Sequence, residues 1–241
     1  MKSLLALVFT LLTIHAYSQP HQKDSIPTSA GALFITFIGH GSLMMEYQKQ
    51  VIHIDPSSRE ADYSLFPKAD LILITHHHGD HCDPKAFELV NGDSTTTILT
   101  QLAADKLGTG NVLSNGNNTT YKNIKVEALP AYNLVHKREN GEYYHPKGCC
   151  NSYVLTLGDK RVFIGGDTEN TPEMKALKDI DIAFLPMNLP YTMTPEMVAD
   201  AAKAFRPKVL YPYHYGKTDV SELLKLMTTE DDIEIRVRDM E

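Results

Sequence analysis

Four potential metal ligands follow an apolar run near the middle of the first half of the chain. In LILITHHHGDHCDP (residues 71–84), His76, His78, Asp80 and His81 form the pattern H-x-H-x-D-H directly after the apolar residues 71–75. Imidazoles and carboxylates are ligands that Zn²⁺ and similar divalent ions prefer. A tight turn can direct His76 and His78 toward one ion, and Asp80 and His81 toward a second. The pattern therefore predicts a metal-binding turn rather than a solvated histidine-rich loop.

The sequence around this turn resembles the metallo-β-lactamase superfamily, whose characteristic motif is the same H-x-H-x-D-H turn after a strand. Three other segments carry the resemblance: FIGHGSLMMEY…VIHIDP (residues 37–56), RVFIGGDT (161–168) and KVLYPYHYG (208–216). It covers nearly all of the chain beyond residue 31. The chain is most similar to the compact branch that contains ascorbate-6-phosphate lactonase-like hydrolases. The resemblance implies an α/β fold, namely an αββα sandwich of two mixed β-sheets flanked by helices.

The resemblance also implies two sets of metal ligands. His76 and His78 would bind the first ion, and Asp80, His81 and His214 the second. Asp167 would bridge both ions. Zn²⁺ is the expected metal, although Mn²⁺ and Fe²⁺ accept the same ligands.

A third histidine is needed for the first ion, and the sequence offers two. His145 begins HPKG, which is similar to the H-x-x-G turn of the family and lies about 20 residues before Asp167, so we expect His145 to be the ligand. In the lactonase-like branch, however, the histidine often follows a Pro-Ala dipeptide, and here LPAYN places Asn133 at that point. His136, which lies nearby, is the alternative.

Several other residues have both a functional and a structural interpretation. His40, in the motif GHGS, is either a contact to a ligand or substrate or a structural histidine. Asp55 either accepts the second N–H of a metal-bound histidine, as carboxylates often do, or caps a turn. His77 is expected to point away from His76 and His78, and His53 is expected in the core or on the surface.

The three cysteines, Cys82, Cys149 and Cys150, are too few for a disulfide-based scaffold. Free thiols are the default expectation. Because Cys82 follows the histidine turn and the other two follow His145, a disulfide between Cys82 and one of them is conceivable.

The expected chemistry is hydrolysis by a hydroxide held between two divalent ions, because bound metal lowers the pKa of water toward neutrality. The target would be a small ester, lactone, amide or phosphodiester, and Asp80 would take up and return a proton. No G-x-S-x-G motif for a serine nucleophile is present. Tyr191 and Lys217 are possible substrate contacts. The alternatives are a nuclease or single-iron oxidoreductase on the same fold, or a non-catalytic metal-binding protein.

The elements that would position these residues begin with a β-meander and continue as alternating strands and helices, which is typical of a layered α/β protein. Cap-and-proline signals predict helix starts at Asp83-Pro84, Thr171-Pro172 and Thr194-Pro195, and a further helix is expected to end at Gly108. A last helix is expected over 221–227. Strands are expected over 33–38, 43–47, 51–54, 71–75, 97–100, 124–129, 153–157, 161–164, 182–185, 209–211 and 233–237.

The start of the chain indicates export, and the charge balance indicates the kind of substrate. Met1-Lys2, the apolar residues 4–14 and the small residues Ala16 and Ser18 predict a signal peptide over residues 1–18, too short to span a bilayer. Residues 19–30 are expected to be a flexible lead-in, followed by one hydrolase domain over 31–241 and by location in the periplasm or outside the cell. With 23 Lys and Arg against 30 Asp and Glu, the chain lacks the excess basic charge that nucleic acid requires, so we expect a small-molecule substrate. Neither a stable membrane anchor nor an oligomeric state is predicted.

Overall fold

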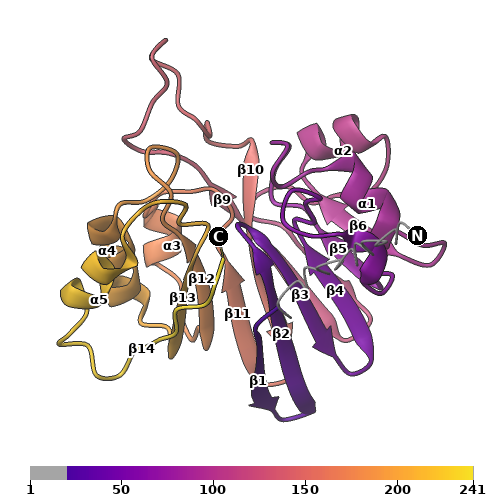
Figure 1. The fold of residues 1–241 in the computed structure, drawn as a ribbon, viewed down its shortest axis with the longest axis horizontal. Coiled ribbons are helices and arrows are strands. Elements are labelled where there is room, and N and C mark those ends of the chain that lie inside the picture. Colours follow the sequence, from indigo (N-terminus) through magenta and orange to yellow (C-terminus); the bar gives the residue numbers. More distant parts are fainter. Residues whose placement is uncertain (1–20, 241) are drawn as a thin grey trace, which may run out of the picture.

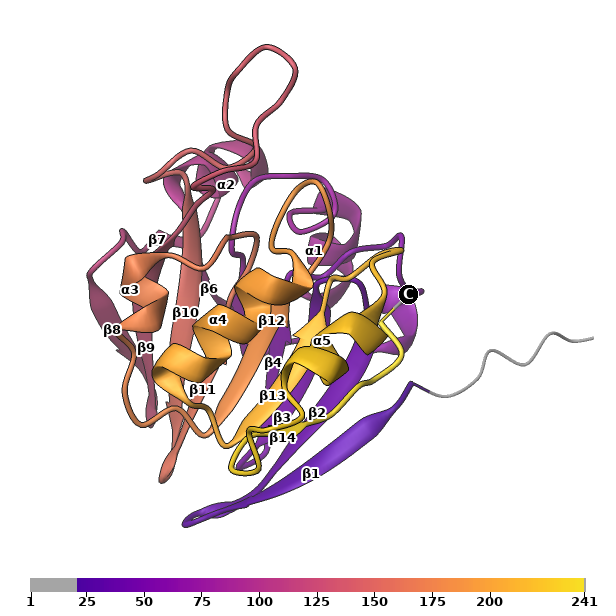
Figure 2. The same ribbon diagram turned by 90° about the vertical axis from the view of Figure 1, so that its left-hand side faces the viewer.

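Two seven-stranded β-sheets pack face to face in the computed structural model, which describes residues 21–240 (Figure 1). The first sheet has the order β1 to β7 and the second the order β14 to β8. In each sheet four strands form an antiparallel meander, and three more follow in parallel. Helices α1 and α2 cover the first sheet, and α3 to α5 cover the second (Figure 1, Figure 2). The expected αββα sandwich with two mixed sheets is therefore confirmed.

The bounds of the elements are as follows. The first sheet contains β1 (Lys23–Thr28), β2 (Gly31–Gly39), β3 (Ser42–Tyr47), β4 (Gln50–Ile54), β5 (Leu71–Leu73), β6 (Thr96–Leu99) and β7 (Asn111–Val112). The second contains β8 (Asn118–Tyr121), β9 (Ile124–Ala131), β10 (Cys150–Leu157), β11 (Lys160–Ile164), β12 (Ile182–Pro186), β13 (Val209–Tyr213) and β14 (Glu234–Ile235). The helices are η1 (Tyr63–Leu65), α1 (Pro84–Val90), α2 (Gln101–Leu107), α3 (Pro172–Lys175), α4 (Pro195–Phe205) and α5 (Val220–Leu226).

Local sequence signals explain where the helices begin. Asp83, Thr171 and Thr194 each accept a hydrogen bond from a backbone amide of the first turn, with proline at the start of the helix. Gly108 ends α2 in the left-handed conformation that glycine adopts without strain. These four predicted boundaries are confirmed.

The main core lies between the two sheets. Phe37 from the first sheet packs against Phe184 and Tyr211 from the second, with ring centroids 6.3 and 5.1 Å away, and all three side chains are buried. A second apolar cluster, which includes Phe87 and Val90, lies between the first sheet and helices α1 and α2. Because both faces of the inner strands are covered, β5 and β12 are apolar throughout.

The expectation of a flexible lead-in over residues 19–30 is wrong for the described part of that range. Residues Lys23–Thr28 form β1, which pairs antiparallel with β2. Ile26 is buried, and Asp24 forms ion pairs with Arg236 and Arg238 from the other end of the chain. Pro27 is tolerated because β1 is an edge strand. The expected signal peptide lies outside the described residues, among which no helix has the length and apolar character of a membrane span.

Candidate metal centre

Loops at one end of the two sheets bring the predicted ligands together. Residues 76–81 follow β5, Asp167 follows β11, and His214 follows β13, so these side chains leave the carboxyl ends of parallel strands. His145 comes from the long loop between β9 and β10, which stands out from the body of the molecule in both ribbon views (Figure 1, Figure 2). Of the predicted ligands, His78, Asp80, His145, Asp167 and His214 line a cavity of about 480 Å³.

One group of ligand atoms consists of His76, His78, His145 and Asp167. His78 Nδ1 lies 3.1 Å from His76 Nε2 and 3.2 Å from His145 Nε2. Asp167 Oδ2 lies 3.3 Å from His145 Nε2 and 3.8 Å from His76 Nε2. One ligand atom of each residue lies within 4.8 Å of the other three, a spacing that allows all four to bind the same ion.

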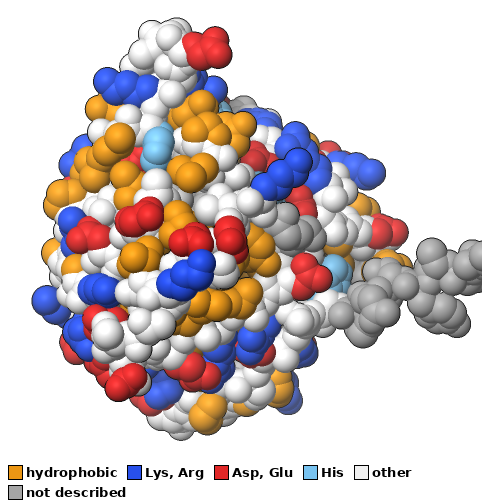
Figure 3. All heavy atoms as spheres, turned by 60° about the vertical axis from the view of Figure 1, so that its left-hand side comes forward, with side chains coloured by type: hydrophobic (Ala, Val, Ile, Leu, Met, Phe, Trp, Pro, Cys, Tyr) orange, Lys and Arg blue, Asp and Glu red, His pale blue; other side chains and the backbone are white. Residues whose placement is uncertain are grey.

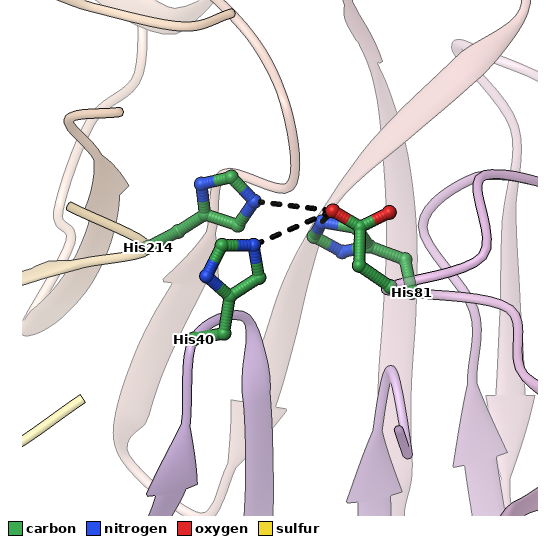
Figure 4. Close-up of side chains that lie close together, drawn as sticks. His40, His81 and His214 are labelled. Carbon is green, nitrogen blue, oxygen red and sulfur yellow. Dashed lines mark hydrogen bonds and ion pairs between the residues drawn. The ribbon is translucent and has the colours of Figure 1, made fainter. Parts of the chain in front are cut away.

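A second group consists of His40, Asp80, His81 and His214. Asp80 Oδ2 lies 3.4 Å from His40 Nε2 and 3.9 Å from both His81 Nε2 and His214 Nε2. Figure 4 shows the imidazoles of His40, His81 and His214 close together, each from a separate segment of the chain. These four residues also satisfy the 4.8 Å spacing.

Asp167 lies between the two groups. Its Oδ2 faces His76 and His145, whereas its Oδ1 lies 3.2 Å from His81 Nε2 and 3.3 Å from His214 Nε2. The carboxylate is almost fully buried. Each of its oxygens is thus available to a different group, as expected for a bridging ligand.

The hydrogen-bonding pattern fits bound cations. Among the described residues, the buried atoms His81 Nε2, His214 Nε2 and Asp167 Oδ1 have no hydrogen-bond partner. Leaving such atoms unpaired in a protein interior is costly. A divalent ion accepts lone pairs from all three, so the residues present suit a metal site.

The protonation states of His76, His78, His214 and Asp167 also fit. Burial lowers the pKa of His78 and of His214 to about 4, and it lowers the pKa of His76 further below its ordinary value. These imidazoles are therefore neutral near pH 7, which is the form that binds metal. Burial opposes ionisation of Asp167, but the neighbouring His214 and His81 outweigh it and hold the pKa of Asp167 well below its usual range. For His81, burial lowers the pKa, but the neighbouring Asp167 and Asp55 outweigh it and raise the pKa above its ordinary value, so metal binding there would displace a proton.

Asp55 orients His81, as the sequence suggested. Its Oδ2 lies 2.7 Å from His81 Nδ1, and the backbone amide and hydroxyl of Thr75 donate to the same carboxylate at 2.7 and 2.6 Å. With Nδ1 engaged, His81 presents Nε2 to the second group. Asp55 fixes the tautomer that metal binding requires.

The structure separates His145 from His136. His145 Nδ1 lies 3.0 Å from Asn133 Oδ1, which leaves Nε2 directed at the first group. His136 instead lies with Nδ1 2.8 Å from the buried Glu169 Oε1 and belongs to neither group. The Glu169 carboxylate also accepts hydrogen bonds from the backbone N–H groups of residues 134, 135 and 136. It thereby fixes the loop conformation that places Asn133 beside His145.

His40 was not among the expected ligands, yet it completes the second group. It occupies the turn between β2 and β3 with a left-handed backbone (φ 50°), and the following Gly41 allows the close approach. A Cβ on Gly41 would lie 2.6 Å from His81 Cε1. The GHGS motif was the available signal, but its histidine could equally have been structural.

The remaining histidines and the cysteines follow the structural interpretations. His77 belongs to neither group, and His53 is buried with Nε2 3.1 Å from the Pro67 carbonyl oxygen. All three cysteines are free thiols, so the conceivable disulfide to Cys82 is not formed. The Sγ atoms of Cys149 and Cys150 lie 2.7 Å apart.

The cavity walls include residues that the sequence did not single out. Tyr191, a possible substrate contact from the sequence, lines the cavity beside Asn188, whereas Lys217 lines a neighbouring hollow instead. Arg59 and Arg138 also line the cavity. Neither arginine lies in a motif, which explains why they were missed.

Comparisons with known proteins agree with this fold. A curated UPF0173 metal-dependent hydrolase from Thermus thermophilus is 30% identical over 190 residues, covering 76% of this chain and 83% of that protein. One from Desulforamulus reducens is 29% identical over 196 residues, covering 76% and 84%. A crystal structure from Parabacteroides distasonis, provisionally named a metal-dependent hydrolase, is 51% identical with a TM-score of 0.87 and covers 92% of this chain and all of that one.

The metallo hydrolase Igni18 from Ignicoccus hospitalis shares the fold at 22% identity, with a TM-score of 0.70 and coverage of 86% and 95%. The family model described as a β-lactamase superfamily domain matches residues 34–214. This range contains all seven metal ligands expected from the sequence, and His214 is its last residue. The chain therefore belongs to the metallo-β-lactamase superfamily and, with its curated relatives, to the metal-dependent hydrolases within it.

Proposed function

We propose that this protein is a dinuclear metal-dependent hydrolase of a small ester, lactone, amide or phosphodiester. The observation that carries the proposal is the position of Asp167, whose two carboxylate oxygens face two separate groups of ligand atoms. A single-ion site would need only one of these groups. The alternative of a single-iron oxidoreductase leaves the second group without a role, and the likeness to curated metal-dependent hydrolases favours an enzyme over a non-catalytic metal-binding protein.

His76, His78 and His145 would hold one ion, Asp80, His81, His214 and His40 the other, and Asp167 would contact both. Zn²⁺ suits this mixture of imidazoles and carboxylates best. Two such ions would supply an activated water at neutral pH and polarise the oxygen of the bond to be cleaved.

Asp80 is the residue best placed to handle a proton. Both Asp80 and Asp167 line the cavity, but the Asp80 side chain is 28% exposed and that of Asp167 only 4%. Burial disfavours the ionised form of Asp80, but the hydrogen bond from His40 and the charge of His81 outweigh this and hold the pKa of Asp80 below its usual range. Asp80 is therefore ionised near pH 7 and can accept a proton from a water molecule in the cavity.

The cavity and the surface favour a small molecule over nucleic acid. A volume of about 480 Å³ is typical of small-ligand pockets. On the face in Figure 3, Lys and Arg side chains alternate with Asp and Glu, and they form no continuous basic stripe. A nuclease would need clustered basic residues to contact phosphates.

Metal quantification and a substrate panel test the proposal. We expect about two ions per chain, in line with the two ligand groups, and hydrolysis of at least one lactone, ester or phosphodiester such as bis-p-nitrophenyl phosphate. His78→Ala should lose metal and turnover together while keeping its circular dichroism spectrum. The matched control is His77→Ala, because His77 is adjacent yet belongs to neither group. One ion per chain, or full activity in His78→Ala, would contradict the dinuclear mechanism.

We also propose that the chain is exported after cleavage near Ser18. The charged start, the short apolar run and the small residues before Gln19 support this. Mass spectrometry of protein recovered from the periplasm or medium should give Gln19 as the first residue. Recovery of chains that retain residues 1–18 in the cytoplasm would argue against export.

A further inference from the structure

We infer that the cavity binds substrates that carry a carboxylate or phosphate group besides the bond to be cleaved, and that Arg59 and Arg138 hold this anionic group. The inference rests on the proposed hydrolase function, because it assigns a substrate class to the same cavity.

All six arginines of the chain lie within residues 21–240. Four of them form ion pairs with carboxylates: Arg161 with Glu127, Arg206 with Glu230 and Asp232, Arg236 with Glu234 and Asp24, and Arg238 with Asp24. Arg59 and Arg138 form no ion pair with any described residue. These two are also the arginines that line the cavity beside the metal centre.

The two arginines reach the cavity from opposite sheets. Arg59 lies on the loop after β4, next to the histidine turn: its Nη2 lies 3.3 Å from the position that a Cβ on Gly79 would occupy. Arg138 lies on the loop between β9 and β10 that also carries His145. A ligand between them would contact both loops and the ligand groups at once.

Arg138 is held in place without being neutralised. Its guanidinium lies 4.9 Å from the centre of the Tyr144 ring, and its Nη2 donates to the Tyr144 carbonyl oxygen at 3.4 Å. Tyr144 in turn packs edge-on against Tyr191, with ring centroids 5.0 Å apart. Stacking leaves most guanidinium N–H groups free, and its planar donors match carboxylate and phosphate oxygens in pairs.

The carboxylates of the cavity do not compensate for this positive charge. Asp80 and Asp167, the two acidic residues that line it, face the histidines of the metal centre. Unpaired cationic groups at the wall of a cleft raise the local concentration of anions. A small ester or lactone with a carboxylate or phosphate substituent therefore fits the cavity better than a neutral one.

Matched lactones test the inference. The metal-loaded protein is assayed with γ-butyrolactone, with its γ-carboxylate, and with its γ-(phosphonooxymethyl) derivative, and kcat/KM is compared. We expect at least one anionic lactone to exceed the neutral one by about tenfold or more, since charge-assisted hydrogen bonds contribute on that scale. The arm with the larger ratio identifies carboxylate or phosphate as the recognised group.

Variants assign the preference to the two arginines. The preference for the anionic lactone should fall about threefold in Arg59→Ala and in Arg138→Ala, and it should be absent in the double variant. Arg206→Ala is the matched control, because Arg206 is exposed but pairs with Glu230 and Asp232 far from the cavity. No anionic preference in the unmodified protein, or a preference that survives the double variant, overturns the inference.

A binding measurement separates this inference from the proposed function. If no lactone is hydrolysed, hydrolysis is in doubt, but calorimetric titration of the lactone γ-carboxylate and of inorganic phosphate into the metal-loaded protein still tests the arginines. Binding that is weakened in the double variant and kept in Arg206→Ala supports the inference. Equal affinity in all three proteins, or no binding to any, refutes it.

Discussion

Replacement of Asn133 by alanine should weaken metal binding, although Asn133 is not itself an expected ligand and does not contact the His145 Nε2 atom that faces the first group. Its Oδ1 accepts the backbone N–H of His145 at 2.8 Å and lies 3.0 Å from His145 Nδ1. Its Nδ2 donates to Glu169 Oε1 and to the Tyr191 carbonyl oxygen, both at 2.9 Å. Asn133 therefore fixes the tautomer and direction of His145 and ties its loop to two other segments.

The expected magnitudes follow from these contacts. Each buried hydrogen bond contributes about 1 kcal/mol, more when the partner is charged as Glu169 is, so Asn133→Ala should lower the free energy of unfolding by about 3–5 kcal/mol. Loss of the partner that orients a ligating histidine costs about 10–100-fold in metal affinity. Both effects should appear in the same variant.

Asn115→Ala separates the two effects. Asn115 Nδ2 donates to the carbonyl oxygens of Leu129 and Cys150 and to Asn151 Oδ1, at 3.2, 3.0 and 2.6 Å, but it contacts no expected ligand. This control should lose similar stability and keep its metal affinity. Urea unfolding of metal-free protein followed by far-ultraviolet circular dichroism measures stability, since the chain has no tryptophan. Competition with a zinc-binding dye measures affinity.

An equal loss of metal affinity in both variants would refute this role of Asn133, because the effect would then follow from stability alone. Unchanged metal affinity in Asn133→Ala would refute it as well. Either result would mean that His145 is directed by the loop backbone and not by this side chain.

Three further predictions concern the ligands, a close contact and the terminal strand. His145→Ala should lose metal in chelator competition, whereas His136→Ala should not, and the reverse result would exchange their roles. Gly41→Ala should lower metal affinity because the added methyl group would collide with the His81 ring. Gly92→Ala is the control and should keep its metal affinity, because its methyl group would lie no closer than 3.6 Å to Thr95 Oγ1. Equal metal affinities of the two variants would contradict this. Burial raises the pKa of Asp24, but Arg238 and Tyr211 outweigh it and lower the pKa below 3.8. Asp24→Asn should therefore lower the free energy of unfolding at pH 7 by about 1–3 kcal/mol, as measured by urea unfolding. The difference from the unmodified protein should shrink as the pH falls below about 3.8 through the pKa of Asp24 in the folded state. A difference that does not depend on pH would exclude the ion pairs as its cause.

Elements governed by local chemistry were predictable. The helix starts at Asp83, Thr171 and Thr194 each depend on an N-cap side chain and on the proline that follows it directly. The backbone amide that donates to the cap lies no more than three residues further along the chain. The buried strands β5 and β12 were predictable because covered strands are continuously apolar. Residues 108–121, which are rich in asparagine and glycine, were not predicted as strands, yet they contain β7 and β8, whose residues are mostly exposed and polar and lack any strand pattern.

Strand β1 was missed because its stabilising contacts are remote in the sequence. The segment KDSIPT has one buried apolar residue, Ile26, and a proline, so its composition suggests a coil. Asp24 is instead anchored by Arg238 and Tyr211, about 190 to 210 residues further along the chain. No window of sequence around β1 contains this information.

The metal centre shows the same division. Residue types and strand ends were predictable from motifs, since each motif lies on one turn. The HPKG motif favoured His145 over His136, but the contact that keeps His136 away from the site was not predictable, because it depends on Glu169, which binds the backbone of the intervening loop from another strand end. The separation of the arginines into paired and unpaired sets depends in the same way on contacts between distant segments. A motif therefore indicates which chemistry a chain can perform, whereas the substrate it accepts is decided by side chains, such as Arg59 and Arg138, that only the folded arrangement leaves without a partner.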